Sequence, residues 1–217
     1  MSEKLISVEF ESRVDPRIAI EAVRERGACA IHNFIAVENL QHAAISLRRE
    51  SMRLDEDMRS NVKRRQAMST YALRSDPLAL PLAQLEKDAP QEIAAIAAEI
   101  AGYVAKDGTI PWRPNEVIGH QYSSNHFIDR HRDYTTAHGI VAVLTLDGLQ
   151  DFYVELDDDE KATKMTMQPG TLTMLRGYNG DAEARPYHWV DRPASSRLAL
   201  SIREMHEHWD TASKSIW

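Results

Sequence analysis

The sequence contains a single cysteine, Cys29, among its 217 residues. One cysteine cannot form an internal disulfide bond or a thiolate zinc site, so any metal must be held by histidine and carboxylate side chains. No segment reaches the roughly 18 consecutive apolar residues that a membrane-spanning helix needs. The charged residues at positions 1–4 are not followed by a long apolar stretch, which argues against a secretory signal. We therefore expect a cytoplasmic protein without a membrane partner.

Glycine and proline are also scarce, with nine residues each, while 43% of the residues are hydrophobic and 27% are charged. This composition is typical of an ordinary globular protein, and the length fits a single domain covering residues 1–217. Lysine and arginine total 26 against 33 aspartates and glutamates, a net charge of −7. The acidic balance weighs against a dedicated nucleic-acid-binding protein, which usually presents a basic face to phosphates.

The two halves of the chain differ in their hydrophobic patterns. Residues 1–110 are expected to be mainly helical, because Asp15-Pro16 begins a helix that stops at Gly27 and apolar residues recur at helical spacing in two further segments. A short strand is expected between the first two helices. These segments are Val37–Leu54 and Gln91–Tyr103 for the helices and Ala28–Phe34 for the strand.

Short runs rich in valine, isoleucine, leucine and threonine follow from residue 111 to residue 205, and residues 206–217 form a polar tail. Turn signals such as Asp147-Gly148, Pro169-Gly170 and Asn179-Gly180 separate some of these runs. The pattern predicts an α+β protein in which helices pack on an antiparallel sandwich or barrel. The predicted strands are Glu116–Tyr122, Ile140–Leu146, Phe152–Leu156, Met165–Gln168, Thr171–Leu175 and Arg197–Arg203.

The segment YSSNHFIDRHRD, residues 122–133, carries the most informative chemistry. His131 and Asp133 are two residues apart, so on a strand their side chains project from the same face. His188 follows in YHWV and can return to the same end of a β core. Two histidines and one carboxylate suit a non-haem iron(II) with three open positions. Arg197 opens a predicted strand, and a guanidinium buried there needs a carboxylate partner.

These segments together resemble the iron(II)- and 2-oxoglutarate-dependent dioxygenases. The resemblance covers about residues 116–204 and rests on HQYSSNHFIDRHRDY, GIVAVLTLDG, MTMQPGTLTMLRG and YHWVDRPASSRLALSIRE, in that order, while GACAIHNFIAVENL looks like the family's entry strand and helix. It implies a double-stranded β-helix, or jelly-roll, core with the N-terminal helices packed on one face. It also implies iron(II), 2-oxoglutarate and dioxygen as the metal and cosubstrates. The implied iron ligands are His131, Asp133 and His188.

The resemblance further implies that Arg197 pairs with the distal carboxylate of 2-oxoglutarate and that Tyr122 hydrogen-bonds the same molecule. Arg203, six residues after Arg197, can face the same way on a strand, and in some relatives it helps to bind 2-oxoglutarate. Many relatives carry serine where this chain has Ala199, so Tyr122 or Ser201 is a candidate for the replacement hydroxyl.

The expected reaction is hydroxylation, or oxidative demethylation, of a C–H bond in a small-molecule or amino-acid-type substrate, with release of succinate and carbon dioxide. A modified nucleobase or a protein side chain is the alternative substrate. Residues 48–74 carry more basic than acidic side chains. They are interpreted as an exposed helix and loop or, more specifically, as a rim that attracts an anionic substrate.

Other interpretations remain open from the sequence. A non-catalytic β-sandwich binding module would not need all four of His131, Asp133, His188 and Arg197. A cupin-type metal enzyme would use more histidines and no 2-oxoglutarate. The pattern His206-Glu207-His208 and the acidic run at residues 157–160 lack metal-site spacing and are interpreted as solvated segments.

Overall fold

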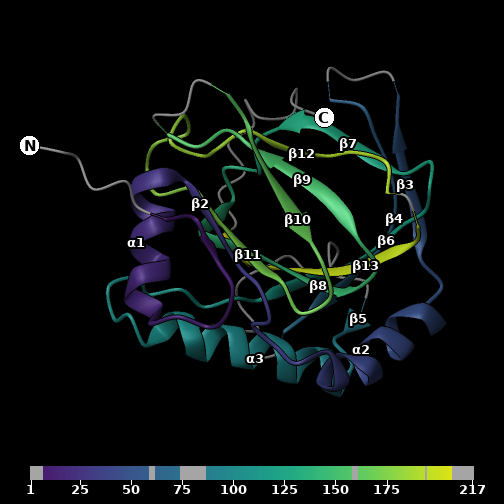
Figure 1. Ribbon diagram of the computed structural model, residues 1–217. Coiled ribbons are helices and arrows are strands. Elements are labelled where there is room, and N and C mark those ends of the chain that lie inside the picture. The colour runs from purple at the N-terminus through teal and green to yellow at the C-terminus, as the bar shows by residue number, and fades with distance from the viewer. Residues whose placement is uncertain (1–6, 59–61, 74–86, 158–160, 194, 207–217) are drawn as a thin grey trace, which may run out of the picture.

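The computed structural model describes residues 7–58, 62–73, 87–157, 161–193 and 195–206. Three helices and thirteen strands lie in these ranges (Figure 1). The helices are α1 (Pro16–Arg26), α2 (Val37–Arg49) and α3 (Gln91–Ala105). The strands are β1 (Glu9–Phe10), β2 (Ala28–Ile31), β3 (Arg53–Asp57), β4 (Arg64–Ala72), β5 (Lys87–Asp88), β6 (Glu116–Tyr122), β7 (Phe127–His131), β8 (Ala137–Asp147), β9 (Gln150–Val154), β10 (Thr163–Met167), β11 (Leu172–Arg176), β12 (His188–Val190) and β13 (Arg197–Met205).

The ends of α1 follow from local sequence chemistry. The Asp15 carboxylate accepts a hydrogen bond from the backbone N–H of Arg17 at 2.9 Å, which satisfies a free donor in the first turn. Gly27 takes a left-handed conformation with φ of 92°, and its N–H bonds the Val23 carbonyl. Glycine adopts this conformation without steric cost and so ends the helix. The predicted boundaries of this helix are confirmed.

The sheet curls into a jelly-roll, which confirms the predicted fold class. Its strand order is β1-β2-β11-β8-β13-β6-β4-β7-β12-β9-β10, with β3 and β5 paired to β4. The strands β9, β10, β12 and β7 form one layer above the layer made by β11, β8, β13 and β6 (Figure 1). The two layers join where Arg64 and Arg65 of β4 pair with β7. The space between the layers is therefore closed at this edge by β4.

The first half of the chain contributes more strand than the sequence pattern indicates. Helix α2 ends at Arg49 because Glu50 is extended, with ψ of 140°. The predicted continuation of this helix to Leu54 is therefore wrong. The exposed helix and loop predicted over residues 48–74 are also wrong where this segment forms the hairpin β3–β4. Cross-strand ion pairs hold this charged hairpin together, since Arg64 meets Asp55 at 2.7 Å. Arg59 and Arg74 of the basic segment lie outside the described residues.

Helices α2 and α3 run along the outer face of the lower layer, and α1 lies beside β2 (Figure 1). Their apolar faces bury Ile20, Leu40, Leu47, Ile93 and Ile100 against the sheet, each at most 1% exposed. A second apolar cluster fills part of the space between the layers. Its members include Tyr122, Val141, Phe152, Met165, Met167 and Leu175. The helices thus stabilise the sheet from outside and leave its interior for a site.

The turn between β8 and β9 contains Gly148, which has φ of 79°. A Cβ atom on this residue would lie 2.2 Å from the Ser196 carbonyl oxygen and 2.9 Å from the Arg197 Cα. Only glycine allows this approach. The turn therefore packs directly against the start of β13, where Arg197 enters the interior.

None of the helices in the described ranges is long and apolar enough to cross a membrane.

Candidate active site

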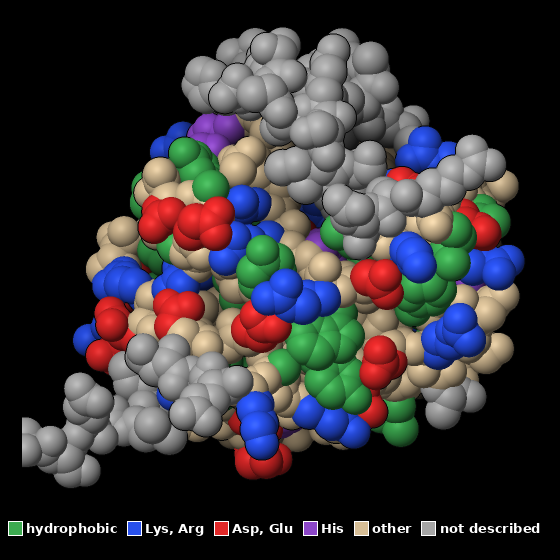
Figure 2. All heavy atoms as spheres, turned by 90° about the horizontal axis from the view of Figure 1, so that it is seen from above, with side chains coloured by type: hydrophobic (Ala, Val, Ile, Leu, Met, Phe, Trp, Pro, Cys, Tyr) green, Lys and Arg blue, Asp and Glu red, His purple; other side chains and the backbone are tan. Residues whose placement is uncertain are grey.

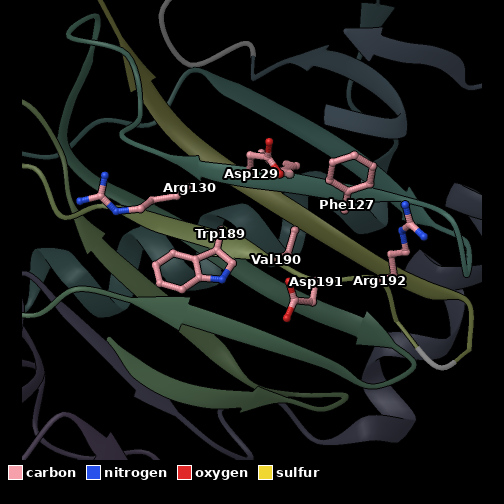
Figure 3. A pocket seen from close by; sticks show the side chains of 8 residues that line it. Phe127, Asp129, Arg130, Trp189, Val190, Asp191 and Arg192 are labelled. Carbon is pink, nitrogen blue, oxygen red and sulfur yellow. The ribbon is translucent and has the colours of Figure 1, made fainter. Parts of the chain in front are cut away.

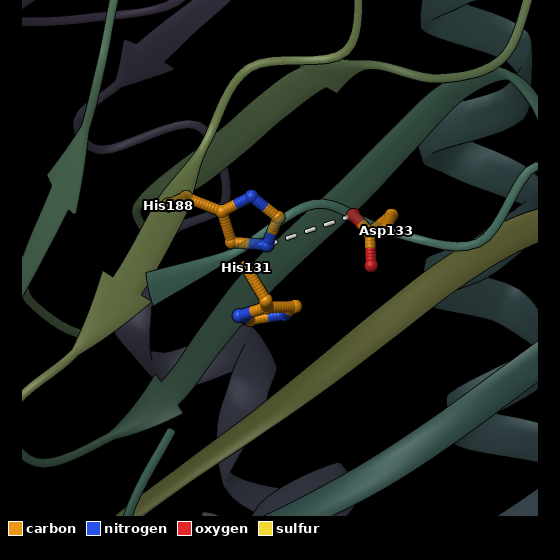
Figure 4. Close-up of side chains that lie close together, drawn as sticks. All are labelled: His131, Asp133 and His188. Carbon is orange, nitrogen blue, oxygen red and sulfur yellow. Dashed lines mark ion pairs between the residues drawn. The ribbon is translucent and has the colours of Figure 1, made fainter. Parts of the chain in front are cut away.

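Three side chains converge in the interior, two from neighbouring strands and one from the segment that follows the first of these strands. His131 is the last residue of β7 and His188 is the first residue of β12, and the two are cross-strand partners. Asp133 lies two residues beyond the end of β7, and not in the strand on which the sequence argument placed it. One ligand atom from each residue lies within 4.8 Å of the others. Figure 4 shows the carboxylate of Asp133 pointing at the His188 ring, with Oδ2 and Nε2 3.7 Å apart.

Hydrogen bonds to backbone carbonyls fix the orientation of both histidine rings. His131 Nδ1 lies 2.8 Å from the Asp129 carbonyl and His188 Nδ1 lies 3.2 Å from the Pro186 carbonyl. A carbonyl oxygen only accepts, so the Nδ1 of each ring is protonated, and Nε2 is the nitrogen through which each ring would bind a metal. Backbone carbonyls commonly fix metal-binding histidines in this way. The donor set of two imidazole nitrogens and one carboxylate is the set that non-haem iron(II) prefers.

Burial and mutual charge set the protonation of the group. Burial, followed by the neighbouring His188, lowers the pKa of His131 to about 4. Burial disfavours the charged form of Asp133, but His188 and Arg203 outweigh burial and lower the pKa of its carboxyl group. At neutral pH, His131 is therefore a neutral imidazole and Asp133 a carboxylate. Both are in the form that binds a metal cation.

Two cavities are lined by side chains of the metal-binding group. The first, of about 60 Å³, lies among the inward faces of β6, β8, β12 and β13. All six residues that the sequence assigns to the site line it, namely Tyr122, His131, Asp133, His188, Arg197 and Arg203. The second, of about 220 Å³, lies toward the hairpin β3–β4 and also contacts His131, Asp133 and Arg203. The structure thus brings together residues that are up to 81 positions apart in the sequence.

Arg197 is buried in the first cavity without a carboxylate partner among the described residues. It is 2% exposed, and burial lowers the pKa of its guanidinium to about 10. Its Nη1 donates to Gln150 Oε1 at 2.9 Å and its Nη2 donates to Thr145 Oγ1 at 2.8 Å. Its Nε has no hydrogen-bond partner in the described part of the chain. A buried guanidinium paired only with neutral groups is costly, and an anionic ligand would compensate it.

Thr145 and Gln150 were missed by the sequence argument. Thr145 on β8 is the cross-strand partner of Ala199, where many relatives carry serine. Its hydroxyl accepts the hydrogen bond from Arg197 Nη2. Ser201 does not do so, because its hydroxyl lies 2.9 Å from His120 Nε2. Neutral residues on neighbouring strands give no charge or spacing signal, so strand register was needed to find them.

A row of hydrogen-bonded side chains runs across neighbouring strands and includes Tyr122. Its members are Asp55, Gln66, Tyr122, His120 and Ser201. Gln66 Nε2 donates to the Asp55 carboxylate at 3.1 Å, which turns Gln66 Oε1 toward Tyr122 and His120. The Tyr122 hydroxyl donates to this oxygen at 3.2 Å, and His120 Nδ1 lies 2.9 Å from it. His120 must then carry its proton on Nδ1, and Nε2 accepts from the Ser201 hydroxyl. Burial lowers the pKa of His120 to about 3, so the row contains a neutral histidine.

Arg203 lies on the same face of β13 as Arg197, as predicted from their even spacing. Its side chain contributes to both cavities. Its Nε is buried without a hydrogen-bond partner among the described residues. It lies near enough to Asp133 to help lower the pKa of that carboxyl group. Arg203 therefore adds positive charge at the boundary between the two cavities.

An open hollow of about 760 Å³ also lies along β7 and β12, lined by residues that include Phe127, Arg130, Trp189 and Arg192 (Figure 3). Figure 2 views the molecule from the side on which β7 and β12 lie and shows a central group of hydrophobic side chains surrounded by charges of both signs. The hollow contains none of the three candidate metal ligands. Its size alone therefore does not make it the reaction site.

Other histidine and acidic side chains have contacts of their own outside the metal group. His126 bonds the Gln121 carbonyl, and His138 stacks on His206 with ring centroids 4.0 Å apart. Asp157, at the start of the acidic run, pairs with Arg176. Residues 158–160 and 207–217 lie outside the described residues, so the rest of the acidic run and of the His-Glu-His pattern is not placed.

Comparison with known proteins identifies the fold. No protein-family model and no curated protein sequence matches the chain. Solved structures do match. A prolyl-4-hydroxylase from Pseudomonas putida superposes with a TM-score of 0.67 at 15% identity over 89% of this chain and 100% of that chain. The α-ketoglutarate-dependent epimerase SnoN of nogalamycin biosynthesis gives 0.65 at 12% identity over 88% and 83%.

An oxidoreductase of the 2OG-Fe(II) oxygenase family from Burkholderia pseudomallei also matches, with a TM-score of 0.60 at 15% identity over 92% of this chain and 98% of that chain. The chain has the fold of the iron(II)- and 2-oxoglutarate-dependent oxygenases. The expected jelly-roll and the structural resemblance to these oxygenases are thus confirmed over nearly the whole chain. Because one fold can carry several functions, the functional argument rests on the site residues themselves.

Proposed function

We propose that this protein is an iron(II)- and 2-oxoglutarate-dependent oxygenase that hydroxylates, or oxidatively demethylates, a C–H bond of a small-molecule or amino-acid-type substrate. His131, Asp133 and His188 would hold the metal through two imidazole Nε2 atoms and one carboxylate. Arg197 would pair with the distal carboxylate of 2-oxoglutarate, and Tyr122 and Arg203 would line the same pocket. Succinate and carbon dioxide would be released.

The observation that carries the proposal is the position of Arg197. A guanidinium that is 2% exposed and bonded only to Gln150 and Thr145 lies in the same cavity as the metal-binding group. A dicarboxylate with a keto group matches the chemistry of both the Arg197 guanidinium and the metal-binding group. One carboxylate can form charge-assisted bonds with the arginine, while the keto acid end reaches the metal. A binding module would gain nothing from an uncompensated charge beside three metal ligands.

The residues of the chain would orient the reactants and exclude water. Gln150 and Thr145 hold the Arg197 guanidinium in place, and burial raises the pKa of Tyr122 to about 12, so its hydroxyl keeps its proton. Bound iron would supply the activation of dioxygen, with one oxygen atom going to succinate and the other to the substrate. The apolar walls Val141, Phe152 and Met167 limit access of water to the first cavity.

The proposal is tested by screening candidate small molecules for stimulated succinate release by the iron-loaded protein. Products are then analysed by mass spectrometry for the gain of one oxygen atom, or for the net loss of CH2 that results when a methyl group is released as formaldehyde and replaced by hydrogen. His188→Ala should abolish succinate formation because the metal loses one of three protein ligands. His126→Ala serves as the control, since His126 bonds a backbone carbonyl outside the metal group. Undiminished succinate formation by His188→Ala would overturn the metal assignment.

A further inference from the structure

The cavity of about 220 Å³ beside the metal group has a lining of its own. Its outer wall is formed by inward-facing residues of the hairpin β3–β4, among them Arg53, Asp55 and Arg64, together with Tyr134. Its inner wall is formed by residues that it shares with the first cavity, including His131 and Asp133. A molecule in this space would therefore lie beside the metal group on the side away from Arg197.

The charges of this lining are not balanced among the described residues. Arg64 is occupied, because its Nε donates to Asp55 at 2.7 Å and its Nη1 lies 3.6 Å from Asp57. Asp133 belongs to the metal group. Neither Arg53 nor Arg203 forms an ion pair within 4.0 Å with a carboxylate in the described ranges. Two positive charges therefore remain at one cavity.

The surplus of positive charge at this cavity persists when the carboxylates of 2-oxoglutarate are included. The two carboxylates of 2-oxoglutarate would be matched by Arg197 and by the metal. Asp133 would compensate part of the metal charge. Asp55 and Glu116 lie near enough to interact electrostatically with Arg53 and Arg203 respectively, but neither arginine would have a carboxylate of the described residues within ion-pair distance. Arg203 Nε is in addition buried without a hydrogen-bond partner among the described residues. A buried donor of this kind costs free energy until a ligand satisfies it.

The size of the cavity restricts the ligand. Sites for drug-sized molecules usually span about 300–1,000 Å³, and this cavity spans about 220 Å³. An aromatic ring from Tyr134 and the apolar side chains of Met68 and Ile118 contribute to its walls. These features fit a small molecule with an apolar body and one anionic group.

Building on the proposed function, we propose that the substrate is a small carboxylic acid whose carboxylate is recognised by Arg53 at the rim and Arg203 in the wall. The apolar part of this acid would then lie next to His131 and Asp133, within reach of the oxidising metal. Arg53 lies on β3, outside the cavity that contains Arg197. It is therefore a specificity-determining residue for the substrate and not for 2-oxoglutarate.

The test separates this inference from the proposed function by measuring binding in two steps. The full chain is loaded with zinc, a redox-inactive substitute for iron, and 2-oxoglutarate is titrated by calorimetry. With 2-oxoglutarate saturating, phenylacetate and hexanoate are then compared with phenylacetamide and hexanamide by saturation-transfer NMR. The amides have nearly the same shape as the acids but carry no charge.

We expect both acids to bind at least tenfold more tightly than their amides, and Arg53→Gln to weaken acid binding by about fivefold while leaving 2-oxoglutarate binding unchanged. Arg65→Gln is the matched control. It removes the same charge from β4, but Arg65 pairs with Glu56 at 3.2 Å and does not line the cavity.

Equal binding of acids and amides, no binding of either acid at millimolar concentration, or equal effects of Arg53→Gln and Arg65→Gln would each overturn the inference. If 2-oxoglutarate itself failed to bind the zinc-loaded protein, the proposed function would fall instead. If 2-oxoglutarate binds and the acids do not, only the assignment of the substrate class is wrong.

Discussion

Replacing Arg197 by methionine should separate the two roles of a buried residue, stability and ligand binding. Methionine has a similar length and no charge. Removing a buried, hydrogen-bonded side chain usually destabilises a protein by several kcal/mol. Arg197 is different, because its charge has no anionic partner among the described residues. We therefore expect Arg197→Met to leave the ligand-free protein about as stable as the wild type.

The magnitude follows from the pKa of this group. Burial lowers the pKa of Arg197 from 12.5 to about 10, which corresponds to an unfavourable free energy of about 3 kcal/mol for the buried charge. The substitution removes this cost. It also leaves Gln150 and Thr145 each without one hydrogen bond, at about 1–2 kcal/mol each. The two effects nearly cancel, so the free energy of unfolding should change by less than about 1 kcal/mol.

Urea unfolding of the zinc-loaded protein with and without 2-oxoglutarate measures both effects. A ligand at one hundred times its dissociation constant stabilises the wild type by about 2.7 kcal/mol, and Arg197→Met should lose this gain. Arg176→Met is the control, since Arg176 pairs with Asp157 and bonds backbone carbonyls. It should destabilise the protein but keep the stabilisation by 2-oxoglutarate. A loss of more than about 3 kcal/mol in ligand-free Arg197→Met would refute the reasoning.

Three further predictions concern the interior. The pKa of His120 is about 3 in the folded protein and near 6.5 in the unfolded chain, so only the unfolded chain gains a proton between pH 7 and 4.5. Over this range the wild type should therefore lose about 2–3 kcal/mol more of its free energy of unfolding than His120→Asn does. Equal losses in urea titrations would contradict this. Gln66→Leu should cost about 2–4 kcal/mol by leaving its partners unpaired, and an unchanged urea midpoint would exclude it. Gly119→Ala should lower thermal stability by about 1–3 kcal/mol, because its Cβ would lie 2.3 Å from Leu47 Cδ1; an unshifted melting temperature would argue against this packing.

The sequence predicted the metal group because its signal is local and chemical. His131 and Asp133 are two residues apart, and His188 and Arg197 stand out as charged or imidazole side chains beside predicted strands. The prediction placed His131 and Asp133 together on one strand, and this part of it is wrong for Asp133. Strand β7 ends at His131, and the segment beyond it still brings the Asp133 carboxylate to the group.

The hairpin β3–β4 could not be predicted in the same way. Its strand β3, Arg53–Asp57, carries charges at four of five positions and lacks the alternation that marks a strand. It is stable as a strand because Arg64 and Arg65 lie opposite its carboxylates in the register of β4. The second cavity depends on this hairpin, so the sequence suggested a basic rim over residues 48–74 but did not predict the cavity itself. The hairpin and its cavity were missed because they depend on pairing between separate strands, which residue types alone do not reveal.

The central claim is that the cavity containing Arg197 binds 2-oxoglutarate beside a metal held by His131, Asp133 and His188. Calorimetric titration of 2-oxoglutarate into the iron(II)-loaded protein under anaerobic conditions tests it most directly, because dioxygen is absent and binding is measured without turnover. We expect one molecule to bind per chain, and binding to be lost in Arg197→Met. No binding up to high micromolar concentration, or equal binding by Arg197→Met, would contradict the claim.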